Sequence, residues 1–172
     1  MTEISNLDEH IEIAEEIVFS LGKILRSRSE DWLNISTSSE HDIKLVGDKK
    51  AEDFIFNSLI KKSPFPIFGE ESGWKKKQND TLPYWIIDPI DGTVNYLRNI
   101  PICCISIALM HKNRPLIGIV HDFNNKETFT AIKNDGAYLN GESIHVSKNL
   151  KPQDAILATG FPAQAHNSID TI

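Results

Sequence analysis

The spacing of the apolar residues changes once along this chain, about a third of the way from its start, and this change limits the possible folds more than any other feature. From Leu7 to Leu25 apolar residues recur at helical spacing, which predicts a long amphipathic helix, and Ser5 with Asp8 at its start resembles a capping box. A second helix is expected to start after Asp48 and to end at a Lys-Lys-Ser-Pro sequence. The two long helices are therefore predicted in the first third of the chain.

Strands are predicted for the remainder, because β-branched and aromatic residues occur there in short runs bounded by Pro, Gly and Asn. The expected strands are residues 65–68, 84–87, 102–110, 116–123, 128–132, 137–139 and 143–146. The polar segment 27–41 is interpreted as a connection that holds a short strand at residues 32–35. Helices followed by strands with short connections predict an α+β fold, with two amino-terminal helices packed on a largely antiparallel sheet.

Composition and charge exclude several classes of function. With 40% hydrophobic residues, the 172-residue chain is expected to form a single globular domain. Its formal net charge of -6 argues against direct nucleic-acid binding, which needs a basic face, so a phosphate ligand would require local help such as metal ions. No apolar run is long enough to span a membrane, and the acidic amino terminus does not resemble a signal peptide. We therefore expect a cytoplasmic protein that does not bind membranes.

The cysteines and histidines are not predicted to hold a metal. Cys103 and Cys104 are adjacent in an apolar run, where their side chains point to opposite faces, and we interpret them as reduced core residues. The six histidines lie at no metal-ligand spacing and are interpreted as structural or exposed. Any metal site would have to be built from carboxylates.

The segment that is most informative about chemistry is Trp-Ile-Ile-Asp-Pro-Ile-Asp-Gly-Thr-Val-Asn-Tyr, which begins at Trp85. A buried strand is expected to end at Asp88, where the following proline stops the hydrogen-bond ladder, and Gly92 permits a tight turn into a short helix near Thr93. Asp88 and Asp91 bracket this turn. Their oxygens suit Mg²⁺, and the backbone amides at the helix start suit a phosphate oxygen.

A second acidic cluster, Gly-Glu-Glu-Ser at residues 69–72, follows the short strand expected at 65–68. Acidic residues at the end of a strand are often no more than a solvated loop, and either cluster alone would favour that interpretation. Two strand ends that both carry carboxylates favour a functional site.

The two sequences together resemble the paired signature of the inositol monophosphatase family. The similarity extends over roughly residues 42–162 and includes the turns and strand sequences expected after residue 102. It implies a layered α/β sandwich of the sugar phosphatase type. Residues 1–172 would then be the amino-terminal portion of one domain whose carboxy-terminal half is absent, and the polar stretch 165–172, which ends without a terminal element, fits that interpretation.

The resemblance implies Mg²⁺ as the cofactor and gives each matching residue a role. Glu70 would bind a metal ion and, together with Thr93, orient the attacking water. Asp88 would bridge two metal ions, Asp91 would bind one, and Ile90 would supply a backbone carbonyl. The residues expected to contact the substrate phosphate are Glu70, Ile90, Asp91, Gly92 and Thr93.

Asp48 is a further catalytic candidate. The family usually has Thr or Ser three residues before this Asp, whereas Leu45 stands there in this chain. Asp48 could instead cap the second helix, since Asp is favoured at that position. Lys49 and Lys50 fit poorly in a first helical turn, which favours the functional interpretation.

The implied activity is the hydrolysis of a small phosphorylated metabolite by a lithium-sensitive enzyme that forms a homodimer when complete. Inositol monophosphate is the first candidate substrate, because Val94, Asn95 and Tyr96 look more like the inositol branch of the family than the bisphosphate nucleotidases. Histidinol phosphate, fructose bisphosphate and adenosine bisphosphate are alternatives. So is a non-catalytic regulatory protein associated with RNA processing, although the matching carboxylates argue against a complete loss of catalysis.

Overall fold

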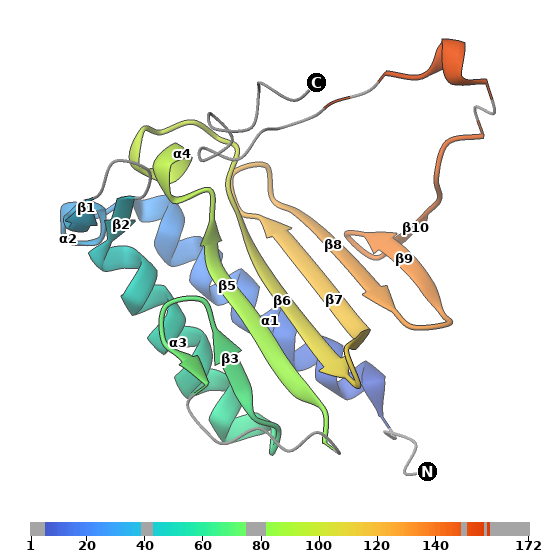
Figure 1. The fold of residues 1–172 in the computed structure, drawn as a ribbon, viewed down its shortest axis with the longest axis horizontal. Helices are drawn as coiled ribbons and strands as arrows, with labels where there is room; N and C mark the ends of the chain where they lie inside the picture. Colours follow the sequence, from blue (N-terminus) through green and yellow to red (C-terminus); the bar gives the residue numbers. More distant parts are fainter. Residues whose placement is uncertain (1–5, 39–42, 75–81, 149–150, 157, 159–172) are drawn as a thin grey trace, which may run out of the picture.

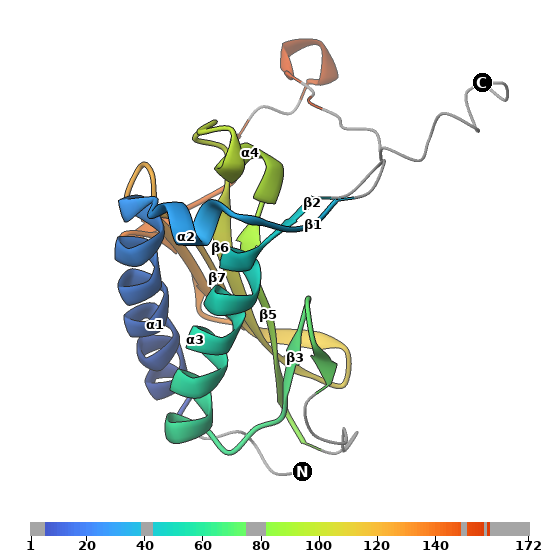
Figure 2. The same cartoon turned by 90° about the vertical axis from the view of Figure 1, so that its left-hand side faces the viewer.

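Two long helices lie side by side on one face of an eight-stranded sheet in the computed structural model of the chain (Figures 1 and 2). The structure describes residues 6–38, 43–74, 82–148, 151–156 and 158. Its helices are α1 (Leu7–Ser27), α2 (Glu30–Leu33), α3 (Val46–Lys62), α4 (Thr93–Leu97) and the 3-10 turn η1 (Pro152–Asp154). Its strands are β1 (Ile35–Ser38), β2 (Ile43–Leu45), β3 (Ile67–Gly69), β4 (Gly73–Trp74), β5 (Tyr84–Asp91), β6 (Cys104–His111), β7 (Arg114–Asp122), β8 (Glu127–Ile132), β9 (Gly136–Leu139) and β10 (Glu142–Ile144).

The large sheet is mixed but mostly antiparallel, as the sequence predicted. Its strand order is β10-β9-β8-β7-β6-β5-β3-β4, and β3 with β5 is its parallel pair. β1 and β2 form a separate antiparallel pair beside the start of α3. Because β3 and β5 run in the same direction, their carboxyl ends lie at the same edge of the sheet. That edge is where both acidic clusters occur.

The hydrophobic core lies between the two long helices and one face of the sheet. Helix α1 packs on β7, and α3 packs on β5. The fully buried Leu21 and Leu25 of α1 belong to one cluster with Ile119, Phe123 and Trp85 of β5. Burial of one large aliphatic side chain contributes about 1.5–3 kcal/mol, so this layer supplies most of the stability. Among the described residues, no helix covers the opposite face, which is turned toward the viewer in Figure 1.

Both predicted helices are confirmed, with one change of boundary. Helix α3 begins at Val46 and not after Asp48, so Asp48 lies inside its first turn. The predicted strand at residues 32–35 is wrong, because α2 occupies Glu30–Leu33 and the strand begins only at Ile35. Glu30 and Asp31 at the start of α2 favour the first turn of a helix. The prediction gave more weight to Trp32, because aromatic residues favour strands. Strands β1, β2 and β4 were not predicted. The capping role expected of Ser5 falls outside the described residues.

Strand β5 is longer than predicted. It continues through Pro89 to Asp91, and its pairing with β6 becomes irregular between Asp88 and Asp91. A proline is tolerated in such an irregularity because no ladder hydrogen bond is required of its nitrogen. The consequence is that both aspartates belong to one strand, with the irregular segment between them.

The cysteines are both free thiols, as expected, but only Cys103 is a core residue. Cys104 is half-buried, and its Sγ lies 3.8 Å from Oδ2 of Asp91. No helix in the described parts of the chain is long and apolar enough to cross a membrane.

Candidate active site

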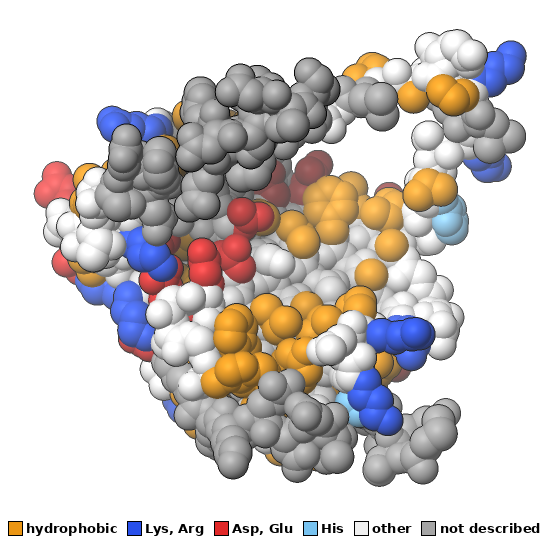
Figure 3. Space-filling view, viewed as in Figure 1, with side chains coloured by type: hydrophobic (Ala, Val, Ile, Leu, Met, Phe, Trp, Pro, Cys, Tyr) orange, Lys and Arg blue, Asp and Glu red, His pale blue; other side chains and the backbone are white. Residues whose placement is uncertain are grey.

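The two acidic clusters meet where the parallel strands β3 and β5 end. Gly69 pairs with Ile87, and the backbone N–H of Glu70 donates to the Ile87 carbonyl oxygen at 3.3 Å. Glu70 therefore follows β3 at the level at which Asp88 continues β5. Figure 3 shows Asp and Glu side chains gathered on this open face of the sheet, next to an apolar area. The sequence prediction that the two clusters lie together is consistent with this arrangement.

Asp88 is the most constrained carboxylate of the group. Its Oδ1 atom is buried and has no hydrogen-bond partner within the described residues. Burial raises the pKa of Asp88 to about 7, and the nearby Glu70 and Asp91 carboxylates add to this increase. A buried carboxylate oxygen without a donor is costly unless a cation or a proton compensates it. This site therefore has a deficit of positive charge.

Thr93 and Asp48 are in contact beside the acidic clusters. The Thr93 hydroxyl lies 3.2 Å from Oδ1 of Asp48 and 3.1 Å from the carbonyl oxygen of Ile90, and its one proton can be donated to either. Asp48 is buried, with 4% of its surface exposed, and its Oδ2 accepts a hydrogen bond from the Leu45 backbone N–H at 2.6 Å. Burial raises the pKa of Asp48 to about 6, although these two hydrogen bonds act in the opposite direction.

Asp48 thus combines the two roles that the sequence offered as alternatives. Its Oδ2 atom stabilises the amino terminus of α3, while its Oδ1 atom faces Thr93. Sequence reasoning grouped Thr93 with Glu70. The structure places the Thr93 hydroxyl on Asp48.

The turn between β5 and α4 is held by close backbone packing. Gly92 has a φ of 91°, and a Cβ atom there would lie 2.8 Å from the Ile102 carbonyl oxygen. Only glycine fits this combination without strain. Asp91 is exposed just before this turn, and the carbonyl of the buried Ile90 faces Thr93. Figure 1 shows α4 beyond the end of β5.

The oxygen atoms of Glu70, Asp88, Asp91 and Ile90 are chemically suited to bind a divalent cation, but their side chains do not yet converge on one point. Carboxylate and carbonyl oxygens are the ligands that Mg²⁺ prefers, and the unpartnered Oδ1 of Asp88 is a natural donor. As the side chains stand, no three His, Cys, Asp or Glu residues in the described ranges are grouped to hold an ion. Glu70 and Asp91 are exposed and can change rotamer, and Mg²⁺ usually keeps several waters.

Two residues around the Gly-Glu-Glu-Ser cluster were not anticipated. Lys44 of β2 places its Nζ atom 2.8 Å from both carboxylate oxygens of Glu71. Glu52 of α3 is a fully buried carboxylate that accepts hydrogen bonds from Glu71 and Ser72. The available signal for Glu52 was its place on the buried stripe of α3, four residues after Asp48 and three before the apolar Ile55.

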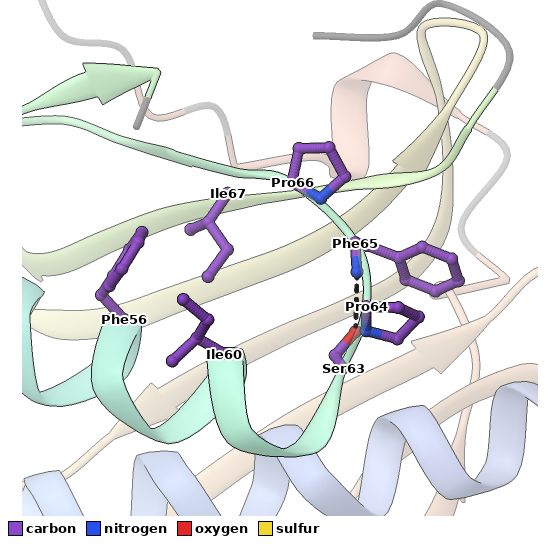
Figure 4. Close-up of a pocket in the computed structure, with 7 residues that line it drawn as sticks. All are labelled: Phe56, Ile60, Ser63, Pro64, Phe65, Pro66 and Ile67. Atoms are coloured by element: carbon purple, nitrogen blue, oxygen red, sulfur yellow. Dashed lines mark hydrogen bonds between the residues drawn. The ribbon is translucent and has the colours of Figure 1, made fainter. Parts of the chain in front are cut away.

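A separate hollow of about 100 Å³ lies between the end of α3 and residues 63–67 (Figure 4). Apart from Ser63, its lining is apolar. It contains none of the predicted site residues, so it is not part of the acidic site.

A family model described as the inositol monophosphatase family matches residues 6–171. Inositol monophosphatase 3 of Solanum lycopersicum is 33% identical over 92% of the chain and 60% of that protein. The Nus factor SuhB of Pseudomonas aeruginosa is 35% identical over 94% of the chain and 61% of that protein.

Among solved structures, the extragenic suppressor protein suhB from Bartonella henselae is similar, with a TM-score of 0.74 and 32% identity. The match covers 81% of the chain and 55% of that structure. The chain thus spans about three fifths of the length of the curated relatives it matches.

Proposed function

This chain belongs to the inositol monophosphatase family, and from that premise we propose that the complete protein hydrolyses a small phosphate monoester with the help of Mg²⁺. The observation that carries the proposal is the meeting of Glu70, Asp88 and Asp91 where β3 and β5 end, with one buried oxygen of Asp88 lacking a donor. A carboxylate cluster of this kind would repel a phosphate ester unless a cation were bound between the carboxylates and the ester. The proposal explains how an acidic site can accept an anionic substrate.

We assign the metal to Glu70, Asp88 and Asp91, with the carbonyl oxygen of Ile90 as a further donor. When bound, Mg²⁺ supplies a polarised water and neutralises negative charge on the phosphoryl and leaving oxygens. Asp88 is fixed within β5 and sets the position of the site. The exposed side chains of Glu70 and Asp91 would complete the set of carboxylate ligands.

The chain's own proton-transfer machinery is the Thr93 and Asp48 pair. In our proposal the Thr93 hydroxyl donates its proton to Oδ1 of Asp48 and accepts one from the attacking water, which orients the water's lone pair toward phosphorus. Glu70 holds the same water from the other side. Burial keeps Asp48 a stronger base than an exposed aspartate, because it raises the pKa of its carboxyl to about 6.

The substrate is proposed to be inositol monophosphate, on the basis of the residues that follow Thr93 and the name of the Solanum relative. The test is phosphate release by the complete gene product from inositol monophosphate, histidinol phosphate, fructose bisphosphate and adenosine bisphosphate, with and without Mg²⁺ and Li⁺. We expect Mg²⁺-dependent release that is fastest with inositol monophosphate and is inhibited by Li⁺. Absence of Mg²⁺-dependent release from all four esters would overturn the proposal.

A second candidate is a regulatory role, which the 35% identity with a Nus factor of Pseudomonas aeruginosa favours. The two functions are separable, because a regulatory protein does not need the metal-binding carboxylates. The test is whether Asp88→Asn restores normal growth to cells that lack the gene. If it does so without hydrolysing phosphate esters, both functions are present. If only the variants that hydrolyse phosphate esters restore growth, catalysis alone explains the cellular role.

A further inference from the structure

Glu52 is a buried carboxylate whose hydrogen bonds are directed at the loop that carries Glu70. The Glu52 side chain is 0% exposed. Its Oε2 atom accepts hydrogen bonds from the backbone N–H groups of Glu71 at 2.8 Å and Ser72 at 3.3 Å. Its Oε1 atom accepts from the Ser72 hydroxyl at 2.5 Å and lies 3.2 Å from Nζ of Lys49. Three of the four donors therefore come from two consecutive loop residues.

The same carboxylate also determines which residue can stand at the end of β3. A Cβ atom built on Gly69 would lie 2.2 Å from Oε2 of Glu52, which is far inside van der Waals contact. Gly69 has no unusual backbone conformation that would otherwise require glycine. The glycine is needed because the carboxylate packs directly against the backbone. Glu52 thus contacts the chain on both sides of Glu70.

Glu70 itself is exposed and has few restraints of its own. On its amino-terminal side the chain is fixed by the pairing of Gly69 with Ile87, and its own N–H donates to Ile87. On its carboxy-terminal side the described hydrogen bonds that fix the next two backbone N–H groups are those to Glu52. Hydrogen bonds to a buried charged acceptor are stronger than hydrogen bonds between neutral groups.

We propose that Glu52 is a positioning residue, which fixes residues 69–72 so that the Glu70 carboxylate is held beside Asp88 for metal binding. The part that concerns metal binding rests on the proposed function, whereas the fixing of the loop does not. Glu52 acts through the backbone of its neighbours and does not contact the metal or the substrate.

The first test compares Glu52→Gln with Glu52→Ala in the 172-residue chain. Gln has the same shape and keeps one oxygen for the backbone N–H groups, and its amide can donate to the Ser72 hydroxyl. Ala removes every acceptor. Lys49→Ala is the matched control, because it removes a partner of Glu52 that is 51% exposed and does not belong to the loop.

Two properties are measured by NMR at a temperature at which each variant is folded. The first is hydrogen exchange at the amides of Glu71 and Ser72, which needs no metal. The second is a Mg²⁺ titration followed at the amides of Glu70 and Asp88. We expect Glu52→Ala to lose amide protection and to bind Mg²⁺ about 10–100-fold more weakly, the range typical for loss of a group that orients a ligand. Glu52→Gln should stay within about threefold of the parent in affinity, because one hydrogen bond is weakened.

A second test approaches the same contact from the loop. Gly69→Ala should displace the Glu52 carboxylate and reproduce the effects of Glu52→Ala. The double variant should be no worse than Glu52→Ala alone, because the clash disappears with the carboxylate, so the two effects will not add. This cycle remains informative if Glu52→Ala does not fold, since Gly69→Ala and Glu52→Gln can then be compared directly.

Each outcome is decisive. Unchanged amide exchange and unchanged Mg²⁺ affinity in folded Glu52→Ala would overturn the inference, as would equal effects of Gln and Ala. Lost protection with unchanged affinity would restrict Glu52 to a structural role and overturn its positioning of Glu70. If the parent chain itself shows no response to Mg²⁺ at Glu70 and Asp88, the proposed metal site fails, and amide exchange alone decides whether Glu52 fixes the loop.

Discussion

Helices α1 and α3 lie on the same face of the sheet but bury different chemistry. The buried face of α1 is apolar throughout and includes Val18 and Leu21. The buried face of α3 carries two carboxylates, Asp48 and Glu52, in its first half, and its buried residues after Glu52 are the apolar Ile55 and Leu59. Burying charge is costly unless each group finds a partner, and both carboxylates do so in backbone or side-chain donors near the site. The difference shows that α1 serves stability, whereas the first half of α3 serves the acidic site.

The largest effect that would test this division is expected from Asp88→Asn, which removes the central charge of the site next to α3. Loss of a metal ligand should reduce Mg²⁺-dependent hydrolysis by the complete gene product by about a thousandfold or more, which corresponds to ~4 kcal/mol. Thermal unfolding of the metal-free 172-residue chain should not occur at a lower temperature, because the substitution relieves crowding among carboxylates. Asp53→Asn, on a carboxylate of α3 that is 46% exposed, is the control and should change neither measurement. Hydrolysis near the parent rate would contradict the metal assignment.

Leu21→Ala tests the other helix. Leu21 is fully buried against the sheet, so its truncation should lower the free energy of unfolding by about 2–5 kcal/mol, as measured in urea. Mg²⁺ affinity of the folded fraction should be unchanged. The exposed Lys23 provides a matched Lys23→Ala variant in the same helix, for which a change within about 0.5 kcal/mol is expected. If Leu21→Ala weakened metal binding in the folded chain, the two helices would not be independent.

Thr93→Ala tests whether the start of α3 takes part in the chemistry. Without the hydroxyl that faces Asp48, turnover should fall by about a hundredfold, the lower range for loss of a proton-transfer group, while Mg²⁺ affinity should change little. Thr93→Ser retains the hydroxyl and should preserve most of the turnover. Equal losses of turnover and metal affinity in Thr93→Ala would instead indicate that Thr93 only supports the local structure.

The smallest effect concerns His121, a titratable group at the interface between α1 and the sheet. It is buried on β7, its Nδ1 atom lies 2.9 Å from the Thr128 hydroxyl, and its ring contacts Phe19 of α1. Burial and then the nearby Arg26 lower the pKa of His121, while Asp122 acts in the opposite direction. The folded state therefore binds this proton less readily than the unfolded state, so stability should decline as pH falls below the ordinary histidine value of 6.5.

The measurement is thermal unfolding between pH 8 and 5 for the parent and for His121→Gln, a replacement of similar polarity. His10 also has its pKa lowered by burial, and it will contribute to the same acid sensitivity in both proteins. The slope below pH 6.5 should therefore be shallower in His121→Gln but not zero. An identical slope in the two proteins would show that His121 is not the responsive group.

The parts of the fold that were predicted are the long elements. Helix α1 follows from the helical spacing of its apolar residues, and strands β5 to β8 follow from β-branched and aromatic runs bounded by turn residues. Short elements were missed, because strands of three or four residues, such as β2 and β1, are too short for their sequence to show a recognisable strand pattern. The predicted end of the strand at Asp88 was wrong. Pro89 lies where the pairing of β5 with β6 is irregular, so its nitrogen does not have to donate a hydrogen bond and the strand can continue.

In the candidate site, the sequence motifs indicated the carboxylates but not the residues that hydrogen-bond to the surrounding loop and turn. Glu70, Asp88 and Asp91 were proposed because they lie within recognisable sequences, and the structure has them at neighbouring strand ends. Glu52 is 18 residues from Glu70 in sequence, and its role depends on how α3 packs against β3. The contact between the Thr93 hydroxyl and Asp48 likewise depends on packing, because the two residues are 45 positions apart.

The packing of α1 on β7 also has a consequence for how the chain folds during synthesis. The Arg26 side chain at the end of α1 donates to the Phe123 carbonyl oxygen, 97 positions later in the sequence. At roughly 5–20 residues per second, the ribosome needs about 5–20 s to make that intervening stretch. Throughout this interval the apolar stripe of α1 lacks β7, the strand on which most of it packs. Helix α1 is therefore expected to reach its final packing late, only after β7 has been made.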